Sequence, residues 1–346
     1  TLKSLPVAGA LAAAASPPSA AADEPLPGWA REAVERDPEV GQELDAAWLH
    51  DELMVEPLEG GGVRYVTRKA VRLRSAGAMG DFHAVGFAHE PEDRIVSFRG
   101  WSVAPDGTVR AADPGDDFED YPLSGISFDH TDSRMRMVRV PGLVVGGAIV
   151  WEHERIEHPD LGGEEMFFGH AVRPTAYARF ELKAGPEWGR ELHLVRGEDL
   201  EVAETDTGIV VTGRDLPSLP VELMRPPARE LLPHAWLRWW RDDGTRGFAD
   251  WDAVGRWYRE LSEDVLSRPG EATELSRRLA PAETEPLLEG LQRAFGFAAR
   301  DVRYVSIEVG VGGHKPSSPA AVCTQRYGDC KDKSFLLRAL VEPWGP

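Results

Sequence analysis

Apolar and polar residues alternate in short runs through most of the chain up to Trp240. One such run places apolar or β-branched residues on one side of the chain and arginines on the other: Val63, Tyr65, Thr67, Val71 and Leu73 against Arg64, Arg68, Arg72 and Arg74. A period of two is typical of a strand with one buried face. Because Gly60–Gly62 can turn the chain just before this run, we expect a β-hairpin here.

The same alternation returns several times between residues 95 and 195, separated by turn sequences such as Pro105-Asp106-Gly107. The runs have no fixed repeat length, which argues against a propeller or a solenoid. Many short strands joined by Gly/Pro turns predict an antiparallel β-sandwich.

The spacing of the apolar residues changes near Gly244. In the last hundred residues this spacing predicts helices with one strand among them. Asp250 can cap a first helix, a second covers 271–279, and Thr284 can cap a third. A strand is expected over 302–309 and a short helix from Pro319 to Arg326. A final helix is expected from Cys330 to Val341. The fold class is therefore α+β, with an N-terminal β region followed by a second, mixed region.

The first residues resemble a secretory signal peptide that has lost its start. Lys3 precedes an apolar stretch from Leu5 to Ala15, and small residues then end in Ala20–Ala22 before Asp23. A disordered Ala/Pro tail is the alternative interpretation. We expect a signal peptide at 1–22, a linker at 23–45, a β-sandwich at 46–243 and a second domain at 244–346. The location is then extracytoplasmic, either periplasmic or secreted.

The formal net charge of −19, from 58 acidic and 39 basic residues, narrows the range of partners. A strongly acidic surface repels phosphate backbones and anionic lipid heads, so we expect neither nucleic-acid binding nor a membrane-surface role. The mature chain contains no stretch that predicts a membrane span.

The sequence Tyr327-Gly328-Asp329-Cys330 carries the clearest chemical signal in the chain. Gly328 permits a sharp turn, and Asp329 is a favourable N-cap. Cys330 would then lie in the first turn of a helix, where free N–H groups and the helix dipole should lower the pKa of its thiol. A structural thiol, or a disulfide with Cys323, is the alternative. The apolar neighbours of Cys323 predict that it is buried.

Three stretches together resemble the bacterial transglutaminase-like superfamily: 303–308, 312–316, and Arg326-Tyr327-Gly328-Asp329-Cys330-Lys331-Asp332-Lys333. Upstream, the stretches 101–107 and 139–143 resemble the β-rich domain of unknown function that precedes this module in exported bacterial proteins. The resemblance implies a papain-like or transglutaminase-like α+β module in the C-terminal region. It also implies that Cys330 attacks an amide carbonyl of a protein or peptide and forms a thioester.

In that superfamily a histidine activates the cysteine and an acid orients the histidine, both from strands downstream of the cysteine helix. No histidine follows Cys330 here, so the resemblance implies a module truncated after the cysteine helix. His314 precedes the cysteine and is expected to be a loop residue. The histidines His153, His158 and His170 lack the tight spacing of metal ligands, so we expect no metal and no cofactor.

Two functions remain open from the sequence. The first is thiol acyl transfer or amide hydrolysis with Cys330 as the nucleophile, Asp329, Gly328 and Tyr327 supporting its turn, and a protein or peptide substrate. The second is a non-catalytic extracytoplasmic binding or scaffold protein built on the β-sandwich.

Overall fold

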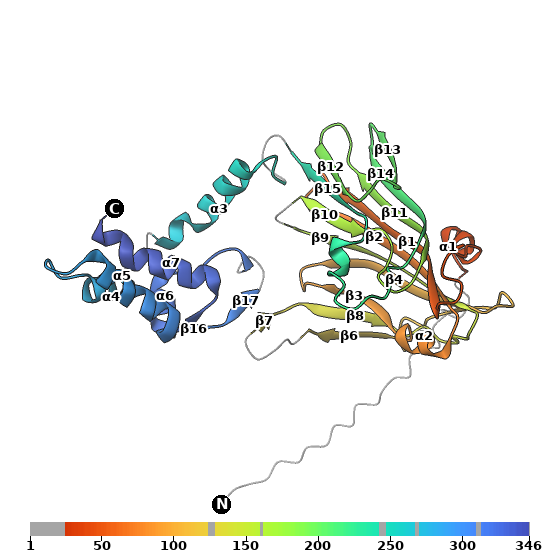
Figure 1. The fold of residues 1–346 in the computed structure, drawn as a ribbon, viewed down its shortest axis with the longest axis horizontal. Helices are drawn as coiled ribbons and strands as arrows, with labels where there is room; N and C mark the ends of the chain where they lie inside the picture. The colour runs from red at the N-terminus through yellow and green to blue at the C-terminus, as the bar shows by residue number, and fades with distance from the viewer. Residues whose placement is uncertain are drawn as a thin grey trace, which may run out of the picture.

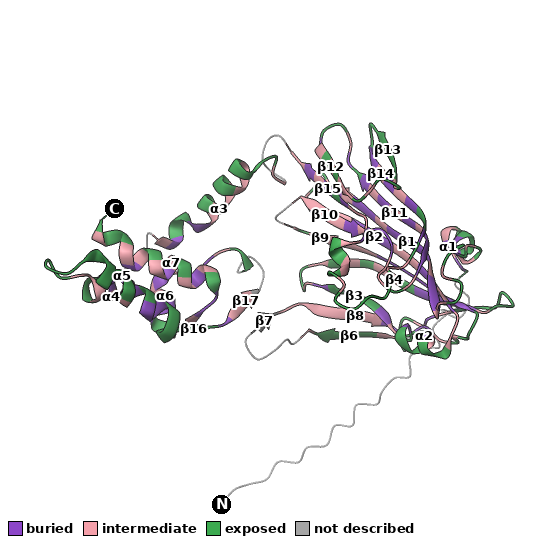
Figure 2. Ribbon diagram, viewed as in Figure 1, coloured by how far each residue is buried: buried purple, intermediate pink, exposed green. Residues whose placement is uncertain are grey.

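The computed structural model describes residues 25–123, 129–159, 162–241, 247–266, 270–308 and 313–345. The expected signal peptide at 1–22 lies outside these residues, as does Gly244, near which the period changes. Figure 1 shows two regions, with sheets at one end and helices at the other. Figure 2 shows buried residues concentrated in the long strands and in the helices around α7 (Cys330–Val341).

An eight-stranded sheet forms the main layer, in the order β13-β14-β11-β1-β2-β9-β4-β5. Its strands are β1 (Ala46–Pro57), β2 (Val63–Leu73), β4 (Arg94–Val103), β5 (Val109–Ala111), β9 (Ala148–Glu157), β11 (Thr175–Lys183), β13 (Glu201–Thr205) and β14 (Gly208–Leu216). The pair β1 and β2 is the expected hairpin. The pair β1 and β11 is parallel, however, so the region is not antiparallel throughout.

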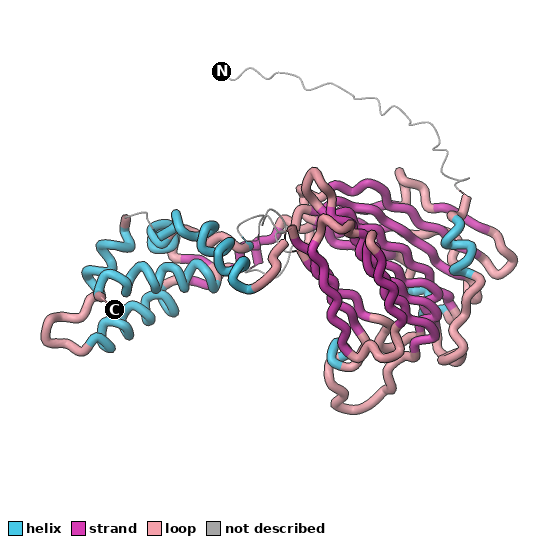
Figure 3. Tube along the Cα trace, turned by 90° about the horizontal axis from the view of Figure 1, so that it is seen from above, coloured by secondary structure: helices cyan, strands magenta, loops and turns pink. Residues whose placement is uncertain are grey.

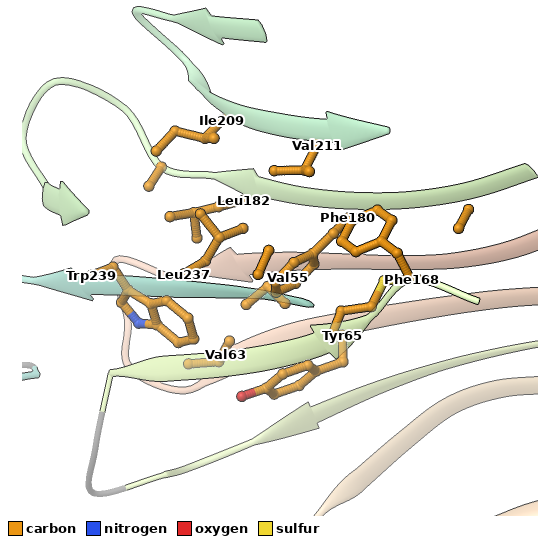
Figure 4. Packing of buried hydrophobic residues seen from close by; sticks show 14 of the residues in the cluster. Val55, Val63, Tyr65, Phe168, Phe180, Leu182, Ile209, Val211, Leu237 and Trp239 are labelled. Atoms are coloured by element: carbon orange, nitrogen blue, oxygen red, sulfur yellow. The ribbon is translucent and has the colours of Figure 1, made fainter. Parts of the chain in front are cut away.

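Two three-stranded antiparallel sheets cover one face of this layer, in the orders β10-β15-β12 and β3-β8-β6 (Figure 3). Their strands are β3 (Val85–His89), β6 (Phe118–Pro122), β8 (Arg134–Val138), β10 (Gly163–Phe167), β12 (Gly189–Val195) and β15 (His234–Trp240). Figure 4 shows Leu237 and Trp239 of β15 packed against Val55, Phe180 and Leu182 of the large sheet. The second small sheet packs Val85 and Val138 against other residues of that face.

The opposite face of the large sheet is partly covered by α1 (Gly28–Val34). Adjacent residues of β2 show the two faces, because Ala70 packs with Ala30 and Ala33 of α1 while Val71 packs with the small sheets. The segment expected as a linker at 23–45 therefore contributes to the core of the β region. Within this segment only Gly28–Val34 forms a helix, α1.

Helices dominate the C-terminal region: α3 (Trp251–Leu266), α4 (Glu271–Leu279), α5 (Leu287–Gly296), α6 (Pro319–Gln325) and α7. Asp250 accepts a hydrogen bond of 2.7 Å from the Ala253 N–H at the start of α3, as a cap does. Thr284 does not cap α5, whose N-cap is Pro286. A shared apolar core includes Ala294, Val322, Leu336 and Leu340.

The strand expected over 302–309 is divided into β16 (Arg303–Tyr304) and β17 (Ser306–Glu308). β16 pairs with β18 (Tyr327–Gly328), just before α7. β17 pairs in parallel with β7 (Asp129–Thr131), which belongs to the β region in sequence. The α+β class with a β-rich N-terminal region is confirmed. The remaining short elements are α2 (Ala76–Asp81) and the single turns at 228–230, 297–301 and 342–344.

Candidate functional site

Cys330 is the first residue of α7, as the sequence predicts, and it is exposed. Both cysteines are free, so the disulfide alternative is not observed. Cys323 is 5% exposed and packs with Val322 and Leu336 in the helical core. Burial raises the pKa of the Cys323 thiol. The two sulfur atoms therefore have opposite environments, and of the two only Cys330 is exposed.

A capping box fixes the helix start beneath Cys330. The Asp329 carboxylate accepts hydrogen bonds from the N–H groups of Lys331 (3.1 Å) and Asp332 (3.3 Å). Asp332 accepts in return from the Asp329 N–H at 3.3 Å. The Asp332 carboxylate also accepts from the Ser317 N–H at 2.6 Å and so ties the preceding loop to α7. These contacts hold the first turn in a single geometry.

Gly328 is required by this capping box. A Cβ atom at position 328 would lie 2.7 Å from the Cβ of Asp332, closer than two carbon atoms pack. Tyr327 and Gly328 form β18, which pairs in parallel with Arg303 and Tyr304. The supporting roles expected for Gly328 and Asp329 thus have a direct structural counterpart. Tyr327 contributes through its strand pairing.

Two lysines follow Cys330 in sequence, Lys331 and Lys333. The Lys331 ammonium forms an ion pair with Asp329. The Lys333 ammonium donates to the carbonyl oxygen of Val302 at 3.0 Å. Both cations are therefore engaged by groups other than the thiol. The helix dipole is then the positive influence that remains at Cys330, and the carboxylates of Asp329 and Asp332 lie at the same end of the helix.

Two tyrosines lie near Cys330. Partial burial, the negative charges of Cys330 and Asp329 and a hydrogen bond with Cys330 raise the pKa of Tyr304. Burial and the charges of Cys330, Asp329 and Asp332 raise the pKa of Tyr258 on α3, against the opposing effect of Lys331. The sequence pattern around Tyr304 does not predict that its side chain lies near Cys330. Only the pairing of β16 with β18 brings it there.

The expected loop histidine, His314, contacts Trp257 of α3 edge to face, with ring centroids 5.6 Å apart. Trp257 is adjacent in sequence to Tyr258, so α3 presents one aromatic ring to His314 and the next toward the cysteine helix. The ring of Tyr258 also contacts the ring of Phe335 on α7 edge to face, with ring centroids 6.3 Å apart. His153 and His170 belong to the β region, on β9 and after β10.

The solved structures that resemble this chain include one of substantial similarity. It is a crystal structure described as a "putative protease" from Parabacteroides distasonis, with a TM-score of 0.64 and 14% identity. The match covers 87% of this chain and 59% of that one. This chain therefore spans about three fifths of the neighbour's length. At this identity the likeness establishes a shared fold, which agrees with the α+β class.

Two other peptidases match over smaller parts of this chain. An M1 zinc metallopeptidase from Deinococcus radiodurans has a TM-score of 0.29 and 11% identity, covering 56% of this chain and 42% of its own. Aminopeptidase A from Legionella pneumophila has a TM-score of 0.27 and 13% identity, covering 59% of this chain and 22% of its own. Similarities this low support no conclusion about the site. No protein-family model matches the sequence, and no curated protein matches it.

Proposed function

We propose that Cys330 is the nucleophile of a thiol-dependent acyl transfer or amide hydrolysis acting on a protein or peptide. The observation that carries the proposal is the position of a free, exposed thiol on the first residue of a helix whose start is fixed by a capping box. The helix dipole at this end favours an anion, and the thiolate is the reactive form of cysteine.

The reaction begins when the thiolate attacks the carbonyl carbon of the amide. A carbon–sulfur bond forms, and the carbonyl oxygen takes the negative charge. The carbon–nitrogen bond then breaks, and the leaving amine takes a proton from an acid. Water or a second amine attacks the resulting thioester and gives up a proton to a base, and the thiolate leaves. The steps use the thiol, the substrate, this water or amine and a proton carrier, and none of them changes an oxidation state.

The rigid backing of α7 supports this role. Leu336 and Leu340 are fully buried in the helical core, and Ser334 donates to the Cys330 carbonyl oxygen at 2.7 Å. A nucleophile on an anchored helix keeps its position while the substrate binds, which positioning catalysis requires. The Tyr304 hydroxyl adds a polar group beside the sulfur that can donate a hydrogen bond to the thiolate.

The sequence resemblance supports the same reaction class, and the fold is shared with a chain described as a protease. In the superfamily the activating histidine and its acid follow the cysteine helix, and no histidine follows Cys330 here. We assign no base to a residue of this chain. The start of the chain supports export as part of the proposal. None of the described helices has the length and apolar character of a bilayer crossing.

An activated ester tests the proposal, because it acylates a reactive thiol without the further catalytic groups that cleavage of an amide requires. Incubation of the full chain with p-nitrophenyl acetate should release one equivalent of nitrophenolate in a fast phase and add one acetyl group to Cys330, identified by peptide mass spectrometry. The Cys330→Ser variant should lose the fast phase, and the Cys323→Ser variant should keep it. Acetylation at other residues with Cys330 unmodified would refute the proposal.

A further inference from the structure

A cleft separates the two small sheets on the covered face of the large sheet. One part has a volume of about 470 Å³ and is walled by Val85, Gly86 and Phe87 of β3 and by Glu164 of β10. An adjoining part of about 450 Å³ is walled by 165–167 of β10 and, away from β3, by Ala228, Arg229 and Leu232. The two parts share a floor of Leu53, Thr67 and Lys69. β3 and β10 therefore flank the same cleft.

β10 is an edge strand, with β15 as its neighbour in the described sheet. The Trp239 N–H donates to Gly162 and the Phe168 N–H donates to Pro233. In an antiparallel pair every second residue bonds its backbone N–H and C=O to the neighbouring strand. The backbone groups of Glu164 and Met166 therefore also point to β15. The backbone groups of Gly163, Glu165 and Phe167 consequently point to the free side. The Glu164 carboxylate contacts the Glu165 N–H, a place that a peptide carbonyl oxygen can take.

β3 is the corresponding edge strand of the other small sheet. Bonds from Leu123 to Ser133 and from Arg139 to Asp117 show that odd-numbered residues of β8 face β6. Even-numbered residues of β8 therefore face β3. The register then directs the backbone groups of Gly86 and Ala88 to the free side of β3. Both residues are exposed and small, so they leave room for another chain.

The outer edge of the same small sheet differs from the inner one. Pro122 of β6 lies opposite Arg134 in a non-bonded pair, so its backbone faces outward. Proline has no N–H to offer and is a common means of blocking an exposed edge. The edge that faces the cleft has no proline in β3, and β10 has none either. The outer edge of this sheet therefore lacks one donor, at Pro122, whereas the edge that faces the cleft keeps the donors of β3.

The floor of the cleft is polar at its centre. Lys69 pairs with Asp51 at 3.1 Å, and Asp51 pairs with His170 at 3.0 Å. The ring of His170 stacks on Trp48 at 4.0 Å. Leu53 and Thr67 complete the floor. A strand lying in the cleft would direct alternate side chains to this floor and the others to solvent.

We propose that a peptide in extended conformation binds in this cleft as an added strand between β3 and β10, joining the two small sheets into one continuous seven-stranded layer. The two opposed edges carry backbone donors and acceptors that another extended backbone complements, and strand addition of this kind is a recurrent mode of peptide recognition. β3 and β10 each have five residues, so the contacts extend over a short peptide segment. The inference goes beyond the proposed chemistry at Cys330 and also fits the alternative of a binding protein.

The test uses the full chain with Cys330 replaced by Ala, so that thiol chemistry does not contribute. An array of random-sequence decapeptides is probed first, and the tightest binders are measured as free fluorescein-labelled peptides by anisotropy. Ala88→Pro and Glu165→Pro each remove one outward N–H from an edge where proline is tolerated. Each should weaken binding about tenfold or more, because the peptide acceptor loses its donor. The matched Ala88→Val and Glu165→Ala variants keep the N–H and should bind within about twofold of the parent.

Methylation of alternate backbone amides of the peptide should weaken binding to a similar degree. Circular dichroism of the proline variants checks that both sheets remain folded. Equal binding by the proline and control variants would overturn the proposal, as would an array without any binder. Concentration-dependent dimerisation that both proline variants abolish would also overturn it, because the edges would then pair with a second copy of the chain.

Discussion

At the scale of single residues, Cys323 and Cys330 lie seven positions apart in sequence and have opposite chemistry. Cys323 is a small apolar residue of the helical core, and burial raises the pKa of its thiol. Cys330 is exposed at a helix start. A glycine-containing turn between α6 and α7 produces this difference, because it redirects the chain between the two residues.

We predict that Tyr304→Phe slows the alkylation of Cys330. The Tyr304 hydroxyl lies close enough to interact with Cys330, and a donor beside a thiolate stabilises the anion. Tyr304 is half exposed, so a modest effect of about threefold to tenfold in rate is expected near pH 6. The measurement is the rate of iodoacetamide labelling over a range of pH.

Tyr121→Phe is the matched control, because Tyr121 has similar exposure but lies on β6 and donates to Met137. It should leave the labelling rate unchanged. If Tyr304→Phe and Tyr121→Phe behave alike at every pH, the hydroxyl of Tyr304 has no influence on the thiol.

At the scale of elements, the start of α7 depends on Asp329. We predict that Asp329→Ala lowers the free energy of unfolding by about 1–2 kcal/mol, because loss of an N-cap costs this amount. Asp329 is also 4% exposed and accepts from two backbone N–H groups. Hydrogen exchange of the first turn of α7 should accelerate together with the loss of stability seen in urea unfolding.

Asp329→Ser provides the conservative test, because serine is also a favourable N-cap. It should retain most of the stability and most of the protection of the first turn. A variant Asp329→Ala with unchanged exchange in α7 would show that the capping box does not hold the helix start.

Local signals predicted several elements closely, while non-local pairings could not be predicted. The helices 271–279 and Cys330–Val341 match the sequence-based bounds, because their periodicity and breakers are local. The parallel pair β1 and β11 and the pairing of β17 with β7 join segments far apart in sequence. Alternation fixes the faces of a strand and not its neighbours.

The candidate site shows the same limit. Gly328, Asp329 and Cys330 are adjacent in sequence, so the turn and the cap could be predicted from residue type. Tyr304 joins them only through the pairing of β16 with β18, and Tyr258 only through the packing of α3. Residue type alone also does not show that Lys331 pairs with Asp329 and that Lys333 donates to the Val302 carbonyl oxygen.

At the scale of the whole molecule, buried ion pairs on both faces of the large sheet link stability to pH. Lys69 and His170 hold the pKa of Asp51 well below its usual range, although burial alone would raise it. Burial also opposes ionisation of Glu52, yet a hydrogen bond from His50 and the charges of His50, Arg68 and Arg179 lower its pKa to about 2. Both carboxylates are therefore ionised in the folded protein at pH values where they are protonated in the unfolded chain.

We predict that the free energy of unfolding falls as the pH drops below about 5. Carboxylates with a lowered pKa stabilise the folded state above their unfolded pKa, and this contribution is lost as the pH falls toward the folded pKa. Each contributes on the order of 2 kcal/mol at neutral pH. Asp51→Asn should be less stable at pH 7 and should lose less stability on acidification, as measured by urea unfolding at several pH values.

Asp116→Asn, in an exposed turn, is the control and should keep the parental slope of stability against pH. Parallel slopes for Asp51→Asn and the parent would contradict the assignment of Asp51 as a linked group. The test reports on the β region, so its outcome is separate from the chemistry proposed for Cys330.

The central claim, an activated nucleophile at the start of α7, is tested most directly by competitive labelling of the native chain. Iodoacetamide is applied near pH 6, and peptide mass spectrometry follows Cys330, Cys323 and free cysteine in the same sample. Cys330 should react about tenfold faster than free cysteine, while Cys323 should remain unlabelled because it is buried. Labelling of Cys330 no faster than that of free cysteine would contradict the account.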